Sequence, residues 1–460
     1  MRFVLALLTI AITSSPAAAQ APADAPVWRP VVMGTYGMVA AEHPLEVMAG
    51  WEVLEGGGNA FDAATAVFYM TTVVEQHQAG MGGDAFIVAY VADQDRVVFI
   101  NGTGGAPALA TSEYFRELGG IPDAGPDATD VPGAVGGFDL ALKTFGTQSY
   151  ARVLAPAIRA AREGHPLDFW SSTYHQNNVE KTAPYPSSVG ILMPEGRALD
   201  RGDVFVQEDL AASMELIAEG GADVFYRGEL ANAFSDFYEE MGGRLRYADL
   251  AAFEPELSDP IMTEFEGLEV YQSAPNSQGI VMLMALNILE GFDLRGMGHN
   301  SADYIHVVTE ALKLAFADRN QWVADPRFID VPTQELLSKD YAAARRALIR
   351  MDRAMVAPAP GDPRAGKAVL ADRTIQYESG TYPIEQTESL PESGETSSFS
   401  IADQYGNLVS VTHSVNGSFG SGMYVPGTGI VLNNRMPYYS TDDNDLNVLA
   451  QGKRTRHTIN

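Results

Sequence analysis

Apolar positions along the chain follow helical spacing in some stretches and alternate with polar positions in others. Helical spacing predicts helices over about 45–55, 60–70 and 304–315, and the glycines at 56–58 end the first of them. The apolar residues that define this first helix are Leu45, Met48, Ala49 and Val53. Two β-rich runs between 86 and 100 flank a short polar segment, which predicts a hairpin. The chain therefore alternates helices and strands, without an internal repeat or a low-complexity block.

The most regular alternation of apolar and polar residues lies close to the C-terminal end. Phe399 and Ile401 alternate with polar residues, and a turn at 404–407 separates this run from a second one. The two runs predict a half-buried hairpin over 396–415. The stretch before it, Val356 to Ser393, is rich in Pro, Gly, Glu and Thr, with few apolar residues at any period. This composition predicts an exposed, mobile connector.

The composition is that of a folded and strongly acidic protein. Apolar residues make up 46% of the 460 residues and charged residues 19%, so a large core is feasible and wholesale disorder is excluded. Lys and Arg number 30 against 59 Asp and Glu, which gives a formal charge of −29. This charge repels phosphate backbones and anionic lipids, so neither a nucleic acid nor a membrane is expected as a partner. The absence of cysteine excludes disulfides, thiolate metal sites and cysteine nucleophiles.

The first 19 residues carry the pattern of a targeting segment. Arg2 precedes a largely apolar run, Phe3 to Ile12, and three alanines follow at 17–19. A charged start, a short apolar region and small residues at a cleavage site predict a signal peptide over 1–19. The apolar run is too short to span a bilayer comfortably, and no later segment is long and apolar enough to do so. We therefore expect a periplasmic or secreted protein, with an N-terminal anchor helix as the alternative.

The C-terminal hairpin opens at a threonine, Thr396, directly after the predicted connector. If the bond before Thr396 is cut, this residue gains a free α-amine beside its own hydroxyl. An amine with a pKa near neutrality can take the hydroxyl proton, so one residue supplies both nucleophile and base. A threonine at the start of a strand is also an ordinary strand former. The spacing alone leaves both interpretations open.

Several short motifs occur in a fixed order over nearly the whole mature chain. They are GGNAFDAA at 57–64, GMGGDAF at 80–86, VPGAVGGF at 131–138, APNSQG at 274–279, EALKLAFADR at 310–319, TSSFSIAD at 396–403, NGSFG at 416–420 and LNN at 432–434. In these motifs and in their order the chain resembles the γ-glutamyltranspeptidases, a family of N-terminal-nucleophile hydrolases. Each motif alone is only modestly specific for this family, whereas the whole set in this order is highly specific for it.

The resemblance implies both a fold and a division of the chain. The expected fold is α+β: a four-layer αββα sandwich in which two antiparallel sheets lie between helical layers, with its C-terminal strands missing from this chain. The large subunit is expected over 20–395, ending in the flexible connector of about 356–395. The start of the small subunit is expected over 396–460. Both subunits come from one precursor.

The same resemblance implies the chemistry and its residues. The precursor is expected to cleave itself between Glu395 and Thr396, after which Thr396 attacks the amide of a small-molecule or peptide substrate and forms an acyl-enzyme. Ser414 stands where a second hydroxyl contacts the nucleophile, and Asn416 stands where an Asn helps hold the substrate. Ordinary strand and turn roles are the alternative for Ser414 and Asn416. This mechanism requires no metal and no organic cofactor.

The chain departs from the family pattern where the γ-glutamyl group is held. Thr103 stands in the place of the Arg that grips the α-carboxylate, and His457 and Thr458 replace a Ser pair that contacts it. Arg435 and Tyr438 stand where acidic or amide side chains hold the α-amino group. A cation cannot accept a hydrogen bond from an ammonium, so Arg435 is expected to repel a γ-glutamyl donor. We expect Arg435 to favour instead an acyl group that ends in a carboxylate without an amine, such as glutaryl.

These departures leave three interpretations of the function. The pocket is similar to that of the acylase branch of the family, which includes cephalosporin-acylase-like and oxamate-amidohydrolase-like members. An ordinary transpeptidase with a rearranged pocket is the second interpretation. The chain also ends at Asn460, where the family continues to a Gly-Gly pair that forms the oxyanion hole. We therefore expect either a fragment of a longer precursor or a damaged homologue, and a non-catalytic binding protein is the third interpretation.

Overall fold

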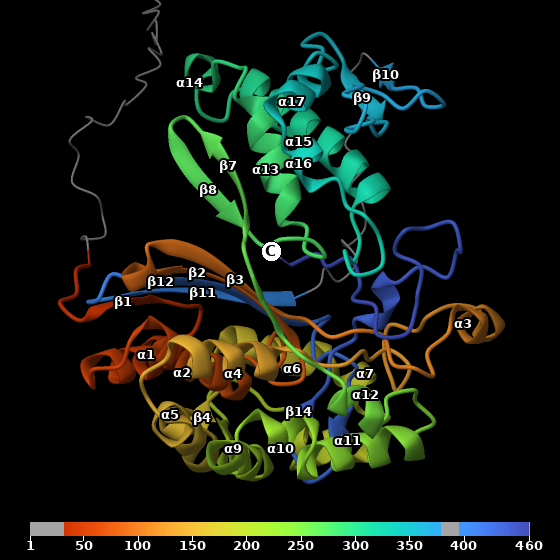
Figure 1. The fold of residues 1–460 in the computed structure, drawn as a ribbon. Helices are drawn as coiled ribbons and strands as arrows, with labels where there is room; N and C mark the ends of the chain where they lie inside the picture. Colours follow the sequence, from red (N-terminus) through yellow and green to blue (C-terminus); the bar gives the residue numbers. More distant parts are fainter. Residues whose placement is uncertain (1–31, 379–394, 460) are drawn as a thin grey trace, which may run out of the picture. The chain divides into compact units, whose positions relative to one another are not determined.

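A six-stranded antiparallel sheet lies at the centre of the computed structural model, which describes residues 32–378 and 395–459 (Figure 1). The strand order is β1-β11-β12-β2-β3-β6. The strands are β1 (Gly37–Ala40), β2 (Asp84–Val91), β3 (Arg96–Gly102), β6 (Glu256–Ser258), β11 (Glu395–Asp403) and β12 (Leu408–Asn416). All of them belong to one compact unit, which begins at Tyr36. The predicted signal peptide, 1–19, lies outside the described residues.

Both predicted hairpins form, and they lie side by side in the sheet. In the first hairpin β2 pairs with β3, with Val88 opposite Phe99. In the second, β11 pairs with β12, with Phe399 opposite Val411. Strand β12 also pairs with β2, where Val411 lies opposite Ile87. The C-terminal hairpin is therefore part of the same sheet as a hairpin that begins more than 300 residues earlier in the chain.

Helices α1 (Pro44–Glu55), α2 (Ala60–Val74) and α4 (Ala134–Phe145) cover one face of this sheet (Figure 1). The predicted first and second helices are thus confirmed. They begin at His43 and Asn59, whose side chains accept hydrogen bonds from N–H groups of the first turn. Met48 was expected on the buried face of the first helix, but its side chain is 63% exposed. Helix α2 is buried along its whole length, because helices on one side and the sheet on the other enclose it.

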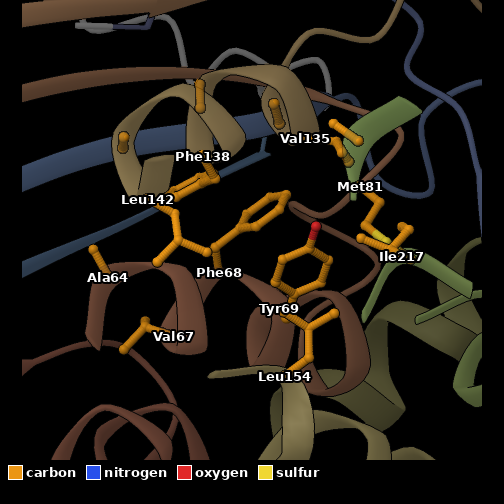
Figure 2. Close-up of a cluster of buried hydrophobic side chains, with 14 of the residues drawn as sticks. Ala64, Val67, Phe68, Tyr69, Met81, Val135, Phe138, Leu142, Leu154 and Ile217 are labelled. Atoms are coloured by element: carbon orange, nitrogen blue, oxygen red, sulfur yellow. The ribbon is translucent and has the colours of Figure 1, made fainter. Parts of the chain in front are cut away.

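Stacked aromatic rings join these helices to the sheet. The Phe68 ring of α2 stacks on the Phe138 ring of α4 at a centroid distance of 4.1 Å, and Phe138 stacks on Phe399 of β11 at 6.2 Å. Figure 2 shows Phe68 and Phe138 in the middle of a cluster that also includes Tyr69 and Leu154. This core fixes β11, the strand that carries Thr396, against the helical layer.

The other face of the sheet lies toward a hairpin and a second group of helices (Figure 1). The hairpin consists of β7 (Ile261–Phe265) and β8 (Leu268–Gln272), and it packs beside α13 (Gly279–Leu289). Helix α15 (Ala302–Trp322) packs along α13 and confirms the predicted helix over 304–315. Among the described residues, no helix is both long enough and apolar enough to cross a membrane.

Part of the predicted connector is ordered, which differs from the expectation of a mobile segment. Strands β9 (Ala354–Ala357) and β10 (Gln376–Glu378) pair with each other. Between them, the N–H of Gly361 donates to Asp318 of α15 at 2.8 Å, and Ala359 is 4% exposed. Long-range hydrogen bonds therefore order a stretch that lacks any apolar period of its own. Residues 379–394 of the connector lie outside the described residues.

Further helices and four short strands occur in the described residues. The remaining helices are α3 (Ser112–Leu118), α5 (Tyr150–Glu163), α6 (Phe169–Asn177), α7 (Val179–Thr182), α8 (Pro186–Leu192), α9 (Glu208–Gly220), α10 (Ala222–Tyr226), α11 (Glu229–Glu240), α12 (Tyr247–Ala251), α14 (Leu294–Met297), α16 (Thr333–Leu336) and α17 (Lys339–Arg346). The remaining strands are β4 (His165–Pro166), β5 (Val204–Phe205), β13 (Tyr424–Val425) and β14 (Ile430–Val431).

Candidate active site

The start of β11 and the end of β12 meet at a break in the regular strand pairing. Glu395 lies opposite Asn416 and Ser397 lies opposite His413, so the register shifts at Thr396. The Ser414 hydroxyl donates a hydrogen bond of 2.5 Å to the carbonyl oxygen of Glu395. It also accepts one of 2.7 Å from the N–H of Asn416. The carbonyl of the peptide bond that precedes Thr396 therefore has a buried hydroxyl donor aimed at it.

The end of β12 can approach β2 closely because β2 is preceded by glycine. Ser414 lies opposite Asp84 in the sheet. A Cβ atom at Gly83 would clash with the carbonyl oxygen of Ser414, so a larger residue there would push the strands apart. Strand β12 ends at Asn416, whose φ of +83° lies in the left-handed region that non-glycine residues seldom adopt.

Two neighbours hold the Asn416 side chain in one orientation. Its amide nitrogen donates to the carbonyl oxygen of Asn434 at 2.8 Å, and its amide oxygen accepts from Arg435 Nη1 at 3.3 Å. The side chain of Asn434 in turn accepts from the N–H of Gly417 at 2.8 Å. Counted over the described residues, one N–H and one lone pair of the Asn416 amide remain for a ligand.

Arg435 lies beneath the site, which differs from its expected place in contact with the acyl group. Its side chain is 1% exposed, and Nε lies 3.5 Å from Asp84 Oδ2. Its Nη2 donates to the carbonyl oxygen of Ser414 at 3.4 Å. The guanidinium is thus directed at Asp84, Ser414 and Asn416, and its charge is compensated by a buried carboxylate. The repulsion expected for a substrate ammonium is reduced accordingly.

Asp84 is a central residue of the site to which no sequence motif assigned a role. Its Oδ1 accepts from the N–H groups of Gly104 and Gly133 at 3.1 and 3.2 Å, and its Oδ2 faces Arg435 and His457. Burial raises the pKa of Asp84 to about 6, and Arg435 opposes this shift. The signal that could have identified Asp84 is its place at the start of a buried strand, directly after Gly-Gly.

A second buried carboxyl group, Asp130, lies near Asp84. Burial and the repulsion from Asp84 both raise the pKa of Asp130 well above its ordinary value. The backbone N–H of Asp130 donates to Asn433 Oδ1, and the Asn433 amide nitrogen donates to the carbonyl oxygen of Gly82, so Asn433 links the backbone at Asp130 to Gly82. Sequence patterns gave no indication of a role for Asp130 either.

Thr103 is buried and its hydroxyl is already engaged. The Oγ1 atom donates to Asn101 Oδ1 at 2.7 Å, and the carbonyl oxygen accepts from Arg454 Nε at 3.1 Å. Asn101 donates in turn to Asn276 at 2.9 Å. Thr103 also lines a pocket together with Arg327 and Arg454, so its contact with a substrate stays a prediction.

The other three predicted pocket residues separate into a buried one and a half-buried pair. His457 is 0% exposed, and its N–H donates to the carbonyl oxygen of Asn276 at 3.0 Å. Burial, followed by the charge of Arg435, lowers the pKa of His457 well below its usual range. The sequence predicts that His457 contacts the substrate, whereas the structure buries its side chain. The hydroxyls of Tyr438 and Thr458, both half-buried, lie 3.2 Å apart.

Within residues 32–378 and 395–459, no three acidic or histidine side chains are placed to share a metal ion.

Comparison with known proteins gives a consistent result. The family profile named gamma-glutamyltranspeptidase matches residues 47–460. The chain is 36% identical over 429 residues to the glutathione hydrolase-like YwrD proenzyme of Bacillus subtilis strain 168, covering 93% of this chain and 76% of the relative. It is 37% identical over 433 residues to the acylase ACY 1 proenzyme of Pseudomonas sp. strain SE83, covering 92% and 73%.

The solved structures agree with the sequence relatives. The crystal structure of cephalosporin acylase from Bacillus halodurans superposes with a TM-score of 0.83 at 35% identity, covering 98% of this chain and 77% of that one. This match confirms the expected α+β fold class of the N-terminal-nucleophile hydrolases. The chain spans about three quarters of the length of these three relatives.

Proposed function

Since this chain belongs to the γ-glutamyltranspeptidase family, a family of hydrolases and acyltransferases, we propose that it is an exported, self-processing amidohydrolase whose nucleophile is Thr396. Two of the relatives named above, from Bacillus subtilis and Pseudomonas sp., are called proenzymes, which agrees with maturation by cleavage. The pattern over residues 1–19 supports export to the periplasm or the medium.

One observation carries the proposal of self-cleavage: the Ser414 hydroxyl donates to the carbonyl oxygen of Glu395. Thr396 Oγ attacks the Glu395 carbonyl carbon, and negative charge develops on the oxygen that Ser414 faces. The C–N bond then breaks, and the proton from the Thr396 hydroxyl ends on the released amine. Water hydrolyses the resulting ester, which leaves a carboxylate at Glu395 and a free α-amine at Thr396.

The mature residue then repeats the same chemistry on an external amide. The α-amine of Thr396 takes the hydroxyl proton while Oγ attacks the substrate carbonyl. The C–N bond of the substrate breaks, the leaving amine receives the proton, and the acyl group remains on Oγ as an ester. Water releases it as an acid, or an acceptor amine releases it as a new amide. The free N–H of Asn416 is available to a polar group of the acyl part.

The acyl group is proposed to lack an α-amine, as in the acylase branch. Thr103 carries no charge, and its hydroxyl is bonded to Asn101, so it does not distinguish a γ-glutamyl from a glutaryl group, since both end in a carboxylate; the α-ammonium is the difference between them. An α-ammonium needs an acceptor, and the buried carboxylate of the site, Asp84, is already paired with Arg435. An ammonium without a carboxylate partner is costly to desolvate. The similarity to a relative named acylase agrees with this substrate class.

The test is a denaturing gel with mass spectrometry of the wild type, Thr396→Ala and Thr396→Ser. We expect the wild type to split between Glu395 and Thr396, the Ala variant to stay whole and the Ser variant to split slowly. Ser398→Ala is the matched control, because Ser398 is an exposed hydroxyl on the same strand. If the Ala variant splits at the same bond, an outside protease is responsible. A wild type that stays whole for days favours a non-catalytic protein.

The substrate proposal has its own measurement. We expect kcat/KM to be higher for glutaryl-p-nitroanilide than for γ-glutamyl-p-nitroanilide. A clear preference for the γ-glutamyl compound would refute the acylase assignment and return the protein to the ordinary transpeptidases.

A further inference from the structure

We propose that Arg435, held by Asp84, is a positioning residue that sets the orientation of the Asn416 amide and does not contact the acyl group. This inference rests on the proposed function, because the orientation of Asn416 matters only if Asn416 holds a substrate. It reverses the role expected for Arg435 from the sequence.

The Arg435 side chain is directed into the protein. It is 1% exposed, and its nitrogens reach three internal groups: Asp84 Oδ2 at 3.5 Å, Asn416 Oδ1 at 3.3 Å and the carbonyl oxygen of Ser414 at 3.4 Å. Its guanidinium carbon also lies 5.8 Å from the centre of the Tyr438 ring. A side chain with these partners spans from β2 to the end of β12, beneath the residues that face the scissile bond.

The chemistry of the guanidinium determines how the Asn416 amide must face it. A guanidinium has five N–H donors and no acceptor, so only the oxygen of the Asn416 amide can face it favourably. The nitrogen of that amide must then point to the carbonyl oxygen of Asn434, as observed at 2.8 Å. A glutamine at position 435 both donates and accepts, so it would no longer require the amide oxygen to face it, and the carbonyl oxygen of Asn434 alone would favour the observed orientation. Arg435 and the carbonyl oxygen of Asn434 therefore together fix which way the Asn416 amide faces, and loss of the arginine removes one of these two constraints.

The backbone of Asn416 and the anchoring of Asp84 support the same role. Asn416 has a φ of +83°, a conformation that persists in a non-glycine residue when its surroundings hold it. A buried guanidinium in turn requires a negative partner, which Asp84 supplies. Asp84 is anchored by the N–H groups of Gly104 and Gly133, so it cannot follow a moving arginine. The N–H groups of Gly104 and Gly133 therefore hold Asp84, Asp84 pairs with Arg435, and Arg435 in turn orients Asn416.

The test compares two donors in a set of variants of the full chain. The donors are γ-glutamyl- and glutaryl-p-nitroanilide, and the variants are Arg435→Gln, Asn416→Ala and the double variant. If Arg435 only positions Asn416, Arg435→Gln lowers kcat/KM for both donors by a similar factor, about 10- to 100-fold, since a misplaced binding group acts on both. The double variant should fall no more than about threefold below Asn416→Ala alone, because the arginine acts through the asparagine.

A matched control separates positioning from general loss of stability. Arg345 and Asp318 form another buried ion pair, both 1% exposed with 3.0 Å between Nε and Oδ2, but they lie in α17 and α15. Arg345→Gln is expected to lower the melting temperature while kcat/KM of the folded protein stays within about twofold of the wild type. Arg435→Lys keeps the charge but loses the fork that spans Asp84 and Asn416. It should therefore be impaired on both donors as well.

The outcomes distinguish this inference from the proposed function. A loss confined to the glutaryl compound, tenfold or more beyond that on the γ-glutamyl compound, would mean that Arg435 contacts the acyl carboxylate. Additive effects of Arg435→Gln and Asn416→Ala would equally overturn the positioning role. A wild type that hydrolyses neither compound refutes the proposed function. In that case crystal structures still decide the inference, since an Asn416 side chain that keeps its place and its hydrogen bond to the Asn434 carbonyl in Arg435→Gln would contradict it.

Discussion

The contact between Ser414 and Glu395 leads to a sharp prediction for Ser414→Ala. The substitution removes the hydroxyl that lies 2.5 Å from the carbonyl oxygen on which negative charge would develop during self-cleavage. Loss of one such donor raises an activation barrier by about 2.7–4 kcal/mol, so cleavage should slow by about 10²- to 10³-fold. Ser414→Thr keeps the hydroxyl and should cleave within about tenfold of the wild type.

The same substitution also affects folding, and the two effects must be separated. Ser414 is 0% exposed, and its oxygen accepts the N–H of Asn416 at 2.7 Å. Without that acceptor a buried N–H is left unsatisfied, which destabilises the fold by about 1–3 kcal/mol. The melting temperature of Ser414→Ala should therefore fall, and cleavage rates should be compared well below it.

The assay is cell-free synthesis of the chain, followed over hours on denaturing gels, with mass spectrometry to locate the cut. We expect the wild type to convert to two fragments while Ser414→Ala remains largely whole. If Ser414→Ala is folded and cleaves within threefold of the wild-type rate, the hydroxyl does not stabilise the transition state. A catalytic role of the Ser414 contact in self-cleavage would then be refuted, whatever residue proves to be the nucleophile.

Two further predictions concern the core. Burial lowers the pKa of His413 to about 3, so below its ordinary value of 6.5 the unfolded chain takes up a proton that the folded chain does not. The free energy of unfolding should fall between pH 7 and pH 5 by about 2 kcal/mol more in the wild type than in His413→Leu. Urea unfolding at both values checks this, and equal losses would contradict it. Phe138→Ala should lower the free energy of unfolding by about 3–5 kcal/mol, because Phe138 stacks between Phe68 and Phe399. Thermal and urea unfolding measure it, and a loss below 1 kcal/mol would show that the stack contributes little.

Local patterns in the sequence predicted the elements of the fold well. The alternation around Phe399 and Ile401 predicted the β11–β12 hairpin, because strand spacing and a turn are encoded within about 20 residues. Periodicity did not predict that β12 lies beside β2 in the sheet, since nothing local specifies which hairpins pair. The connector was misjudged over 356–378 for the same reason: the hydrogen bond from Gly361 to Asp318 cannot be seen in composition.

The proximity of Thr396, Ser414 and Asn416 follows from the sequence alone. They belong to one hairpin, and a two-stranded register brings the ends of that hairpin together whatever surrounds it. The role of Arg435, in contrast, depends on the packing of distant parts of the chain. Its charge was expected to face a substrate, but Asp84, which is 351 positions earlier in the chain, lies beside it and turns it inward. A cation buried without water must pair with a carboxylate, and which carboxylate is near is settled by how distant strands pack.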